Sequence, residues 1–280
     1  MRNPWLHRYA ALVAAGTLYV VVTGALTASA LAANQGGNPV SGHRAVASVL
    51  GVLVIGLVVW LMLVEKRGWL RRLSWIALAG VVAEAGLGEM SGIASPMISM
   101  VHAFLAPLLL AVMVAITVGT SKSWQNDPVL MADQGWPSLR GVARNTLVLV
   151  VIQVALGALF RYDVIGVMTH ILGALVVAVF ILTLVVLVTM MPEHPTLRPA
   201  AVTLGVVTFV QIFLGLTVVS MGSAKTVKVA AVVFGVAHVA TGAITLAVTL
   251  VVALEVWRNV RPASQMANAG SAETGQGLTS

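Results

Sequence analysis

Long apolar segments recur along almost the whole chain, separated by short stretches with Gly, Pro, Asn or charged residues. The eight segments lie near residues 9–32, 44–64, 73–94, 98–119, 143–160, 164–190, 200–221 and 229–256. Most of them approach or exceed the roughly 20 residues that a helix needs to cross the hydrocarbon core of a bilayer. The pattern therefore predicts an all-α integral membrane protein with eight transmembrane helices, arranged as two pseudo-symmetric four-helix bundles.

The first apolar segment has an alternative interpretation as a signal peptide. Its start is basic, and Ala28-Ser29-Ala30 or Ala30-Leu31-Ala32 resembles a signal-peptidase site. The segment spans residues 9–32, which is longer than a typical signal-peptide core. We therefore expect it to remain as a membrane helix.

The composition agrees with a membrane protein and limits its chemistry. Hydrophobic residues make up 59% of the chain and charged residues 9%, with a mean hydropathy of +0.99. The chain has no cysteine, which excludes disulfides, iron–sulfur clusters, thiolate metal sites and a cysteine nucleophile. Any metal chemistry must use histidine, methionine or carboxylate.

The net charge of +7 is explained by membrane topology. With a cytoplasmic N-terminus, 12 of the 16 Lys and Arg residues fall on the cytoplasmic side. The four outer cations are Arg44, Arg161, Lys225 and Lys228. We therefore predict a multi-pass protein of the cell (plasma) inner membrane with both termini in the cytoplasm, whose partner is the lipid bilayer and not nucleic acid.

The chain divides into two halves at its longest polar connection. Residues 121–142 contain Trp and Pro and separate an N-terminal four-helix half, 1–120, from a C-terminal half, 143–258. Residues 259–280 have no apolar periodicity, and we expect a disordered tail there.

A repeat links the two halves. Three predicted helices carry a polar residue followed by Leu and Gly three and four positions later: Glu84-x-x-Leu87-Gly88, Gln153-x-x-Leu156-Gly157 and Gln211-x-x-Leu214-Gly215. The first helix keeps only Thr23-Gly24. Like-oriented halves of this kind imply a pseudo-two-fold axis along the membrane normal.

The helix that follows each of these carries a histidine near its outer end. These histidines are His43, His102, His170 and His238. Ala or Gly follows each of them four residues later, on the same helix face, which leaves room for a bulky group. The other two histidines, His7 and His194, lie outside the pattern, and we expect them to be solvated.

Ionisable side chains in hydrocarbon are costly and indicate a functional site. A single histidine would more often be a packing residue, but matched positions in four helices favour a shared role. Zinc or copper would require the histidines to converge with carboxylate or water. Opposed histidines on antiparallel helices better suit a flat macrocycle with one imidazole on each face, which favours heme iron.

Two of the outer cations, Arg44 and Arg161, are candidate partners for the anionic propionates of heme. Lys225 and Lys228 could serve in the same way. The alternative is that these side chains only snorkel to the interface, as long basic residues commonly do.

The chain resembles the heme A synthase family. The resemblance rests on the paired histidines, His43-Arg44, and the segments Gln153-Val154-Ala155-Leu156-Gly157-Ala158-Leu159 and Thr169-His170-Ile171-Leu172-Gly173-Ala174. It implies that His43 and His102 flank a heme O substrate and that His170 and His238 ligate a resident heme b. It also implies oxidation of the C8 methyl of heme O toward heme A, with electrons passing through the resident heme.

The chain differs from the family pattern at two features that bear on the oxidation reaction. Members carry a glutamate three residues before the first histidine, where this chain has Val40, and many carry a cysteine pair that is absent here. Glu89 is the replacement catalytic carboxylate that we predict. Glu84 occupies the repeat position of Gln153 and Gln211, which favours a structural polar role.

Three functions remain open at this point. The first is a heme A synthase-type oxidoreductase, with heme O synthase or a terminal oxidase as possible partners. The second is a diheme b-type cytochrome that transfers electrons from a quinol or another redox partner and has lost the hydroxylation chemistry. The third is a transporter or assembly protein without a cofactor, which leaves the four histidines unexplained.

Overall fold

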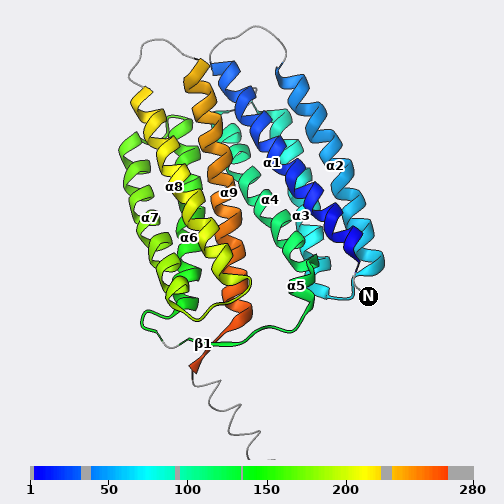
Figure 1. The fold of residues 1–280 in the computed structure, drawn as a ribbon. Helices are drawn as coiled ribbons and strands as arrows, with labels where there is room; N and C mark the ends of the chain where they lie inside the picture. Colours follow the sequence, from blue (N-terminus) through cyan, green and yellow to red (C-terminus); the bar gives the residue numbers. More distant parts are fainter. Residues whose placement is uncertain (1–2, 33–38, 92–94, 134, 222–228, 264–280) are drawn as a thin grey trace, which may run out of the picture.

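The computed structural model describes residues 3–32, 39–91, 95–133, 135–221 and 229–263 (Figure 1). Within these residues, eight helices are long and apolar enough to cross a membrane, which confirms the predicted all-α, eight-span fold. The long helices are α1 (Pro4–Ala32), α2 (Pro39–Val64), α3 (Gly68–Met90), α4 (Pro96–Thr120), α6 (Leu139–Arg161), α7 (Val167–Met190), α8 (Leu197–Met221) and α9 (Val229–Asn259). The short elements are α5 (Lys122–Gln125), β1 (Met131–Asp133) and β2 (Val260–Pro262).

Local capping explains why several helices begin outside their apolar segments. Ser95 accepts a hydrogen bond from the backbone N–H of Met97, and Pro96 occupies the first turn of α4. Ser138 caps α6 in the same way, through the N–H of Gly141. Helix α2 begins at Pro39, so its first turns include His43.

The helices of each half pack as a ring of four. Around the first ring, α1 contacts α2, α2 contacts α3, α3 contacts α4, and α4 contacts α1. The second ring repeats this order with α6, α7, α8 and α9. The histidine-bearing helices α2 and α4 are therefore diagonal partners across the first ring, as α7 and α9 are across the second.

The two rings meet along α4 and α9, with further contacts between α1 and α9 and between α4 and α6. If α1 is exchanged with α6, and α4 with α9, the α1–α9 contact becomes the α4–α6 contact and the α4–α9 contact is unchanged. This is the pattern that a pseudo-two-fold relationship between the halves requires. Val21, Leu110, Ala243 and Ala247 form a buried cluster at this junction. Small residues there let the helices approach closely.

Dense packing is concentrated toward one end of the molecule. Helices α2, α4, α7 and α9 all begin at the other end, which we call the histidine end (Figure 1). The two helices of each histidine pair therefore run parallel, and the expected antiparallel arrangement is wrong, because each pair joins alternate helices of its ring. In α3 the buried residues are Leu70, Ser74 and Ala77, all in the half of the helix away from the histidine end. In α7 burial begins at Val177, well past His170.

The opposite end is held together by the connection between the halves. β1 from this connection pairs in parallel with β2 after α9. Arg140 donates to the carbonyl oxygen of Val260 at 2.8 Å. The first residues of the predicted tail, 259–262, are therefore ordered, whereas its part from residue 264 lies outside the described residues.

Candidate functional site

The four membrane histidines form two pairs with the same geometry. The ring centres of His43 and His102 are 6.4 Å apart, and their planes cross at 72°. The ring centres of His170 and His238 are 6.3 Å apart, and their planes cross at 83°. Each pair joins diagonal helices, so both pairs lie across the interior of their four-helix rings.

A glycine on the preceding helix lies against each histidine ring. A Cβ atom added to the glycine would come 2.9–3.5 Å from the histidine Cε1 atom in all four cases. The pairs are Gly24 with His43, Gly88 with His102, Gly157 with His170, and Gly215 with His238. The glycines of the repeat therefore allow the ring to approach the neighbouring backbone, a role that the repeat pattern alone did not reveal.

In the first ring, polar side chains favour one tautomer of both histidines. Thr23 Oγ1 donates to the carbonyl oxygen of Val20, so it can only accept from His43 Nδ1, which lies 2.9 Å away. Glu84 Oε2 lies 2.5 Å from His102 Nδ1. Hydrogen on Nδ1 leaves the lone pair of Nε2 available for a metal in His43. The short contact with the carboxylate favours the same tautomer in His102, although its Nδ1 is not aligned for a regular hydrogen bond.

In the second ring, amides replace these groups. Gln153 Nε2 lies 3.0 Å from His170 Nδ1 and donates to the His170 carbonyl oxygen at 2.9 Å. Gln211 Nε2 lies 3.4 Å from His238 Nε2. Phe160 stacks on the His170 ring with an interplanar angle of 11°. The polar residues of the sequence repeat thus contact the histidines in both rings.

These residues fit a heme group. Two imidazoles that bind one metal through bonds of about 2 Å have ring centres roughly 6 Å apart, as in both pairs. Buried polar groups are normally paired. Among the described residues, buried atoms without a hydrogen-bond partner nevertheless collect beside the imidazoles, at Glu84 Oε1, His102 Nδ1, Gln153 Oε1, Gln211 Oε1 and His238 Nδ1. The spacing of both imidazole pairs therefore fits one metal-centred group, and in the first four-helix ring His43 also has Nε2 free for the metal.

The predicted catalytic residue Glu89 lies at the histidine end of α3 and pairs with Arg44. The carboxylate and guanidinium are 2.9 Å apart, and the Glu89 side chain is 67% exposed. Within the described part of the chain, the carboxylate that contacts a histidine is Glu84, whose side chain is 12% exposed. Sequence reasoning gave Glu84 only a structural role.

The second predicted propionate partner, Arg161, ends α6 at the histidine end. It donates to the carbonyl oxygen of Ala25 and to the hydroxyl of Ser29, both on α1. Burial raises the pKa of the adjacent Tyr162 phenol, which therefore stays uncharged at neutral pH. Lys225 and Lys228 lie outside the described residues.

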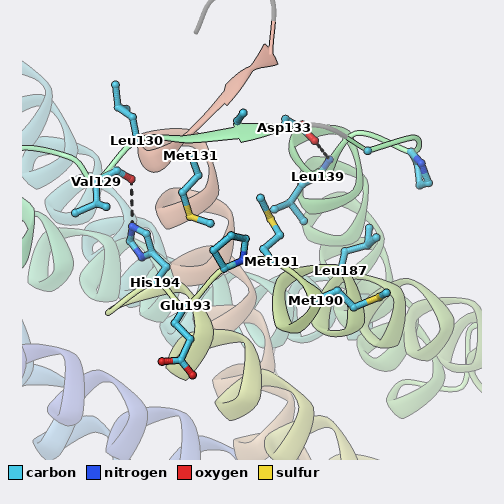
Figure 2. A pocket seen from close by; sticks show the side chains of 14 residues that line it. Val129, Leu130, Met131, Asp133, Leu139, Leu187, Met190, Met191, Glu193 and His194 are labelled. Atoms are coloured by element: carbon cyan, nitrogen blue, oxygen red, sulfur yellow. Dashed lines mark hydrogen bonds between the residues drawn. The ribbon is translucent and has the colours of Figure 1, made fainter.

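The histidines outside the repeat have structural partners, and the expectation that His194 is solvated is wrong. His194 is only 5% exposed. Its Nδ1 accepts from the N–H of Leu197 at 3.2 Å, at the start of α8, and its Nε2 lies 3.3 Å from the Val129 carbonyl oxygen (Figure 2). His7 is half-buried and donates from Nδ1 to the Thr117 carbonyl oxygen at 3.0 Å.

A pocket of about 580 Å³ lies beside His194, at the end opposite the paired histidines (Figure 2). It is lined by the connection between the halves, the end of α7 and the loop that follows it. Its described lining includes none of the paired histidines, so it is separate from the candidate site.

The fold and these contacts define a multi-pass membrane protein with two equivalent histidine pairs. Residues 41–170 match the family model COX15-CtaA, described as cytochrome oxidase assembly protein. The match covers somewhat less than half of the 280-residue chain and agrees with the resemblance to the heme A synthase family. A comparison with curated proteins gave no match.

Proposed function

We propose that this protein is a heme A synthase-type oxidoreductase that oxidises the C8 methyl group of heme O toward the formyl group of heme A. The observation that carries the proposal is the repeated constellation of histidine, contacting glycine and polar partner, arranged as two pairs with ring centres 6.4 and 6.3 Å apart. A packing role would not require a contacting glycine and a polar partner at each of the four histidines.

The N-terminal half, residues 1–120, is the proposed substrate half. His43 and His102 flank heme O there, held by Thr23 and Glu84. Arg44 lies at the edge of this half, where a propionate would meet the membrane surface, and Glu89 beside it is the proposed catalytic carboxylate. Oxidation of a methyl to a formyl group exchanges two hydrogens for one oxygen and removes four electrons, so that with dioxygen as the oxidant one water is the second product. Such a carboxylate would accept or deliver a proton during this step.

The C-terminal half, residues 143–258, is the proposed resident-cofactor half. His170 and His238 are its ligand pair, and heme b bound there supplies one-electron transfer. Gln153 and Gln211 orient the imidazoles of His170 and His238. Gly157 and Gly215 allow these imidazoles to approach α6 and α8. Arg161 is the proposed propionate partner of this half.

The distribution of charge supports the proposed orientation, with both termini in the cytoplasm and the histidine end on the outer face of the plasma membrane. Heme O could then enter from the bilayer. Heme O synthase is the proposed partner that delivers the substrate, and a terminal oxidase is the proposed partner that uses the product. A quinol or another redox protein is the proposed redox partner.

A second function is favoured by one specific observation. Val40 stands where the family pattern has a glutamate, three residues before His43. A chain without that carboxylate could serve as a diheme b-type cytochrome that holds heme firmly in both rings and transfers electrons without hydroxylation.

Heme extraction and chromatography distinguish the two functions. The full chain is co-expressed with a heme O synthase, purified, and examined by reduced-minus-oxidised spectroscopy, beside a His102→Ala variant and an empty-vector control. Heme A or its hydroxylated precursor above both controls supports the synthase. Heme b alone at about two per chain identifies the diheme cytochrome, and absence of any heme contradicts both functions.

A further inference from the structure

The two rings differ at one position of their shared repeat. Gln153 and Gln211 contact the two histidines of the second ring, and Glu84 contacts His102 in the first. Because Gly88, Gly157 and Gly215 lie four residues after these three side chains, the comparison is between equivalent sites. The substitution of a carboxylate for an amide is therefore specific to the ring that we assign to the substrate.

A carboxylate and an amide act differently on an imidazole. An ionised carboxylate only accepts hydrogen bonds, whereas the amide of glutamine can either donate or accept. Glu84 Oε2, in ion-pair contact with His102 Nδ1 at 2.5 Å, therefore favours hydrogen on Nδ1 and draws positive charge toward that side of the imidazole. A carboxylate at this position raises the basicity of a metal-ligating histidine.

The position of Glu84 is costly unless it has such a role. A carboxylate within a membrane helix is unfavourable without a partner. The Glu84 side chain is 12% exposed, and its Oε1 has no hydrogen-bond partner among the described residues. Arg44, the cation near this end of α3, is paired with Glu89 instead. The His102 ring is thus the group that Glu84 contacts.

We propose that Glu84 is a positioning residue that makes His102 the strongest electron donor of the four histidines and thereby lowers the reduction potential of heme bound in the first ring. This inference rests on the proposed function, because it requires heme at His102. Stronger electron donation by an axial ligand pushes electron density onto the iron. Glu84 would thereby distinguish the four-helix ring that carries out oxidation from the one that transfers electrons.

The test is a redox titration of Glu84→Gln, which places the amide of the second ring in the first. A His238→Ala background leaves the second pair only His170, so that the low-spin signal comes from the first ring. Relative to Glu84 in the same background, Glu84→Gln should raise the ratio of reduced to oxidised heme at a fixed potential by about fivefold or more, because a charged hydrogen bond is replaced by a neutral one. Resonance Raman spectroscopy should show a weaker iron–histidine bond.

The reciprocal variant Gln153→Glu provides an independent arm in the other ring. It should lower the reduction potential of heme at His170 and leave the first-ring heme unchanged. Glu84→Gln with heme bound but with unchanged potential and Raman spectrum would overturn the role of Glu84, and so would an unchanged potential in Gln153→Glu. A parent protein without first-ring heme would overturn the proposed function as well, which separates the two failures.

Discussion

Gly215 on α8 lies directly against the His238 ring on α9, and a Cβ atom at Gly215 would come 2.9 Å from His238 Cε1. This approach is tighter than real Cβ contacts, so a methyl group must displace the ring or the backbone. We predict that Gly215→Ala lowers heme affinity in the second ring by about tenfold or more, because the ring that would bind iron loses its orientation. Heme content after titration with hemin measures the effect.

The matched control for this variant is Gly235→Ala, on α9 three residues before His238. A Cβ atom at Gly235 meets no atom within 4 Å, so no contact changes. Alanine is also the better helix former, by about 1 kcal/mol. Gly235→Ala should therefore retain heme and unfold no more easily. Equal heme loss in the two variants would show that the Gly215 contact is not what positions His238.

The fold was predictable because hydrocarbon imposes a simple rule on sequence. The eight apolar segments correspond to the eight long helices, with ends that differ by a few residues where caps such as Ser95 and Ser138 intervene. Short ordered elements without apolar periodicity were missed, including β1 and β2, because their pairing depends on contacts across most of the chain.

The site was predictable in its residues but not in its contacts. The spacing of the histidines indicated four equivalent positions, and the repeat identified Glu84, Gln153 and Gln211 as equivalent to one another. The spacing of residues along one helix does not show which residues of the neighbouring helix they contact. That Glu84 contacts His102, and that Glu89 instead pairs with Arg44, follows from the packing of α3 against α2 and α4.

The proposed ligands of the second ring make a direct prediction. His170→Ala or His238→Ala should abolish the low-spin signal of the resident heme, because one axial ligand cannot maintain six-coordinate iron. The optical and electron paramagnetic resonance spectra of the purified variants measure this loss. His7→Ala is the control, since His7 binds the Thr117 carbonyl oxygen and takes no part in either pair. A normal low-spin signal in either ligand variant would mean that the assignment is wrong.

Glu89 is tested by removing its charge while keeping its size. Glu89→Gln should lower heme A formation by at least tenfold while heme b content stays the same, as expected for a residue that moves protons rather than binds iron. Its exposed ion pair with Arg44 contributes at most about 1 kcal/mol to stability, so little unfolding should accompany the loss. Product analysis after heme O feeding is the measurement. Undiminished heme A in Glu89→Gln would exclude the catalytic role.

His194 is expected to matter for stability alone. Its Nδ1 accepts the N–H of Leu197 at the start of α8, and its ring is buried beside the connection between the halves. His194→Ala should lower the free energy of unfolding by about 1–2 kcal/mol, the usual cost of losing a helix cap. His194→Asn, whose side-chain oxygen can accept the same N–H, should recover part of this loss.

Thermal unfolding in detergent, followed by circular dichroism, measures the change in stability, and the heme spectrum of the same sample serves as its control. The spectrum should not change, because the paired histidines lie at the other end of the helices. The expectation would be contradicted if His194→Ala shifted the heme spectrum and left the unfolding temperature unchanged. His194 would then act on the heme site through the length of α8, and not as a local cap.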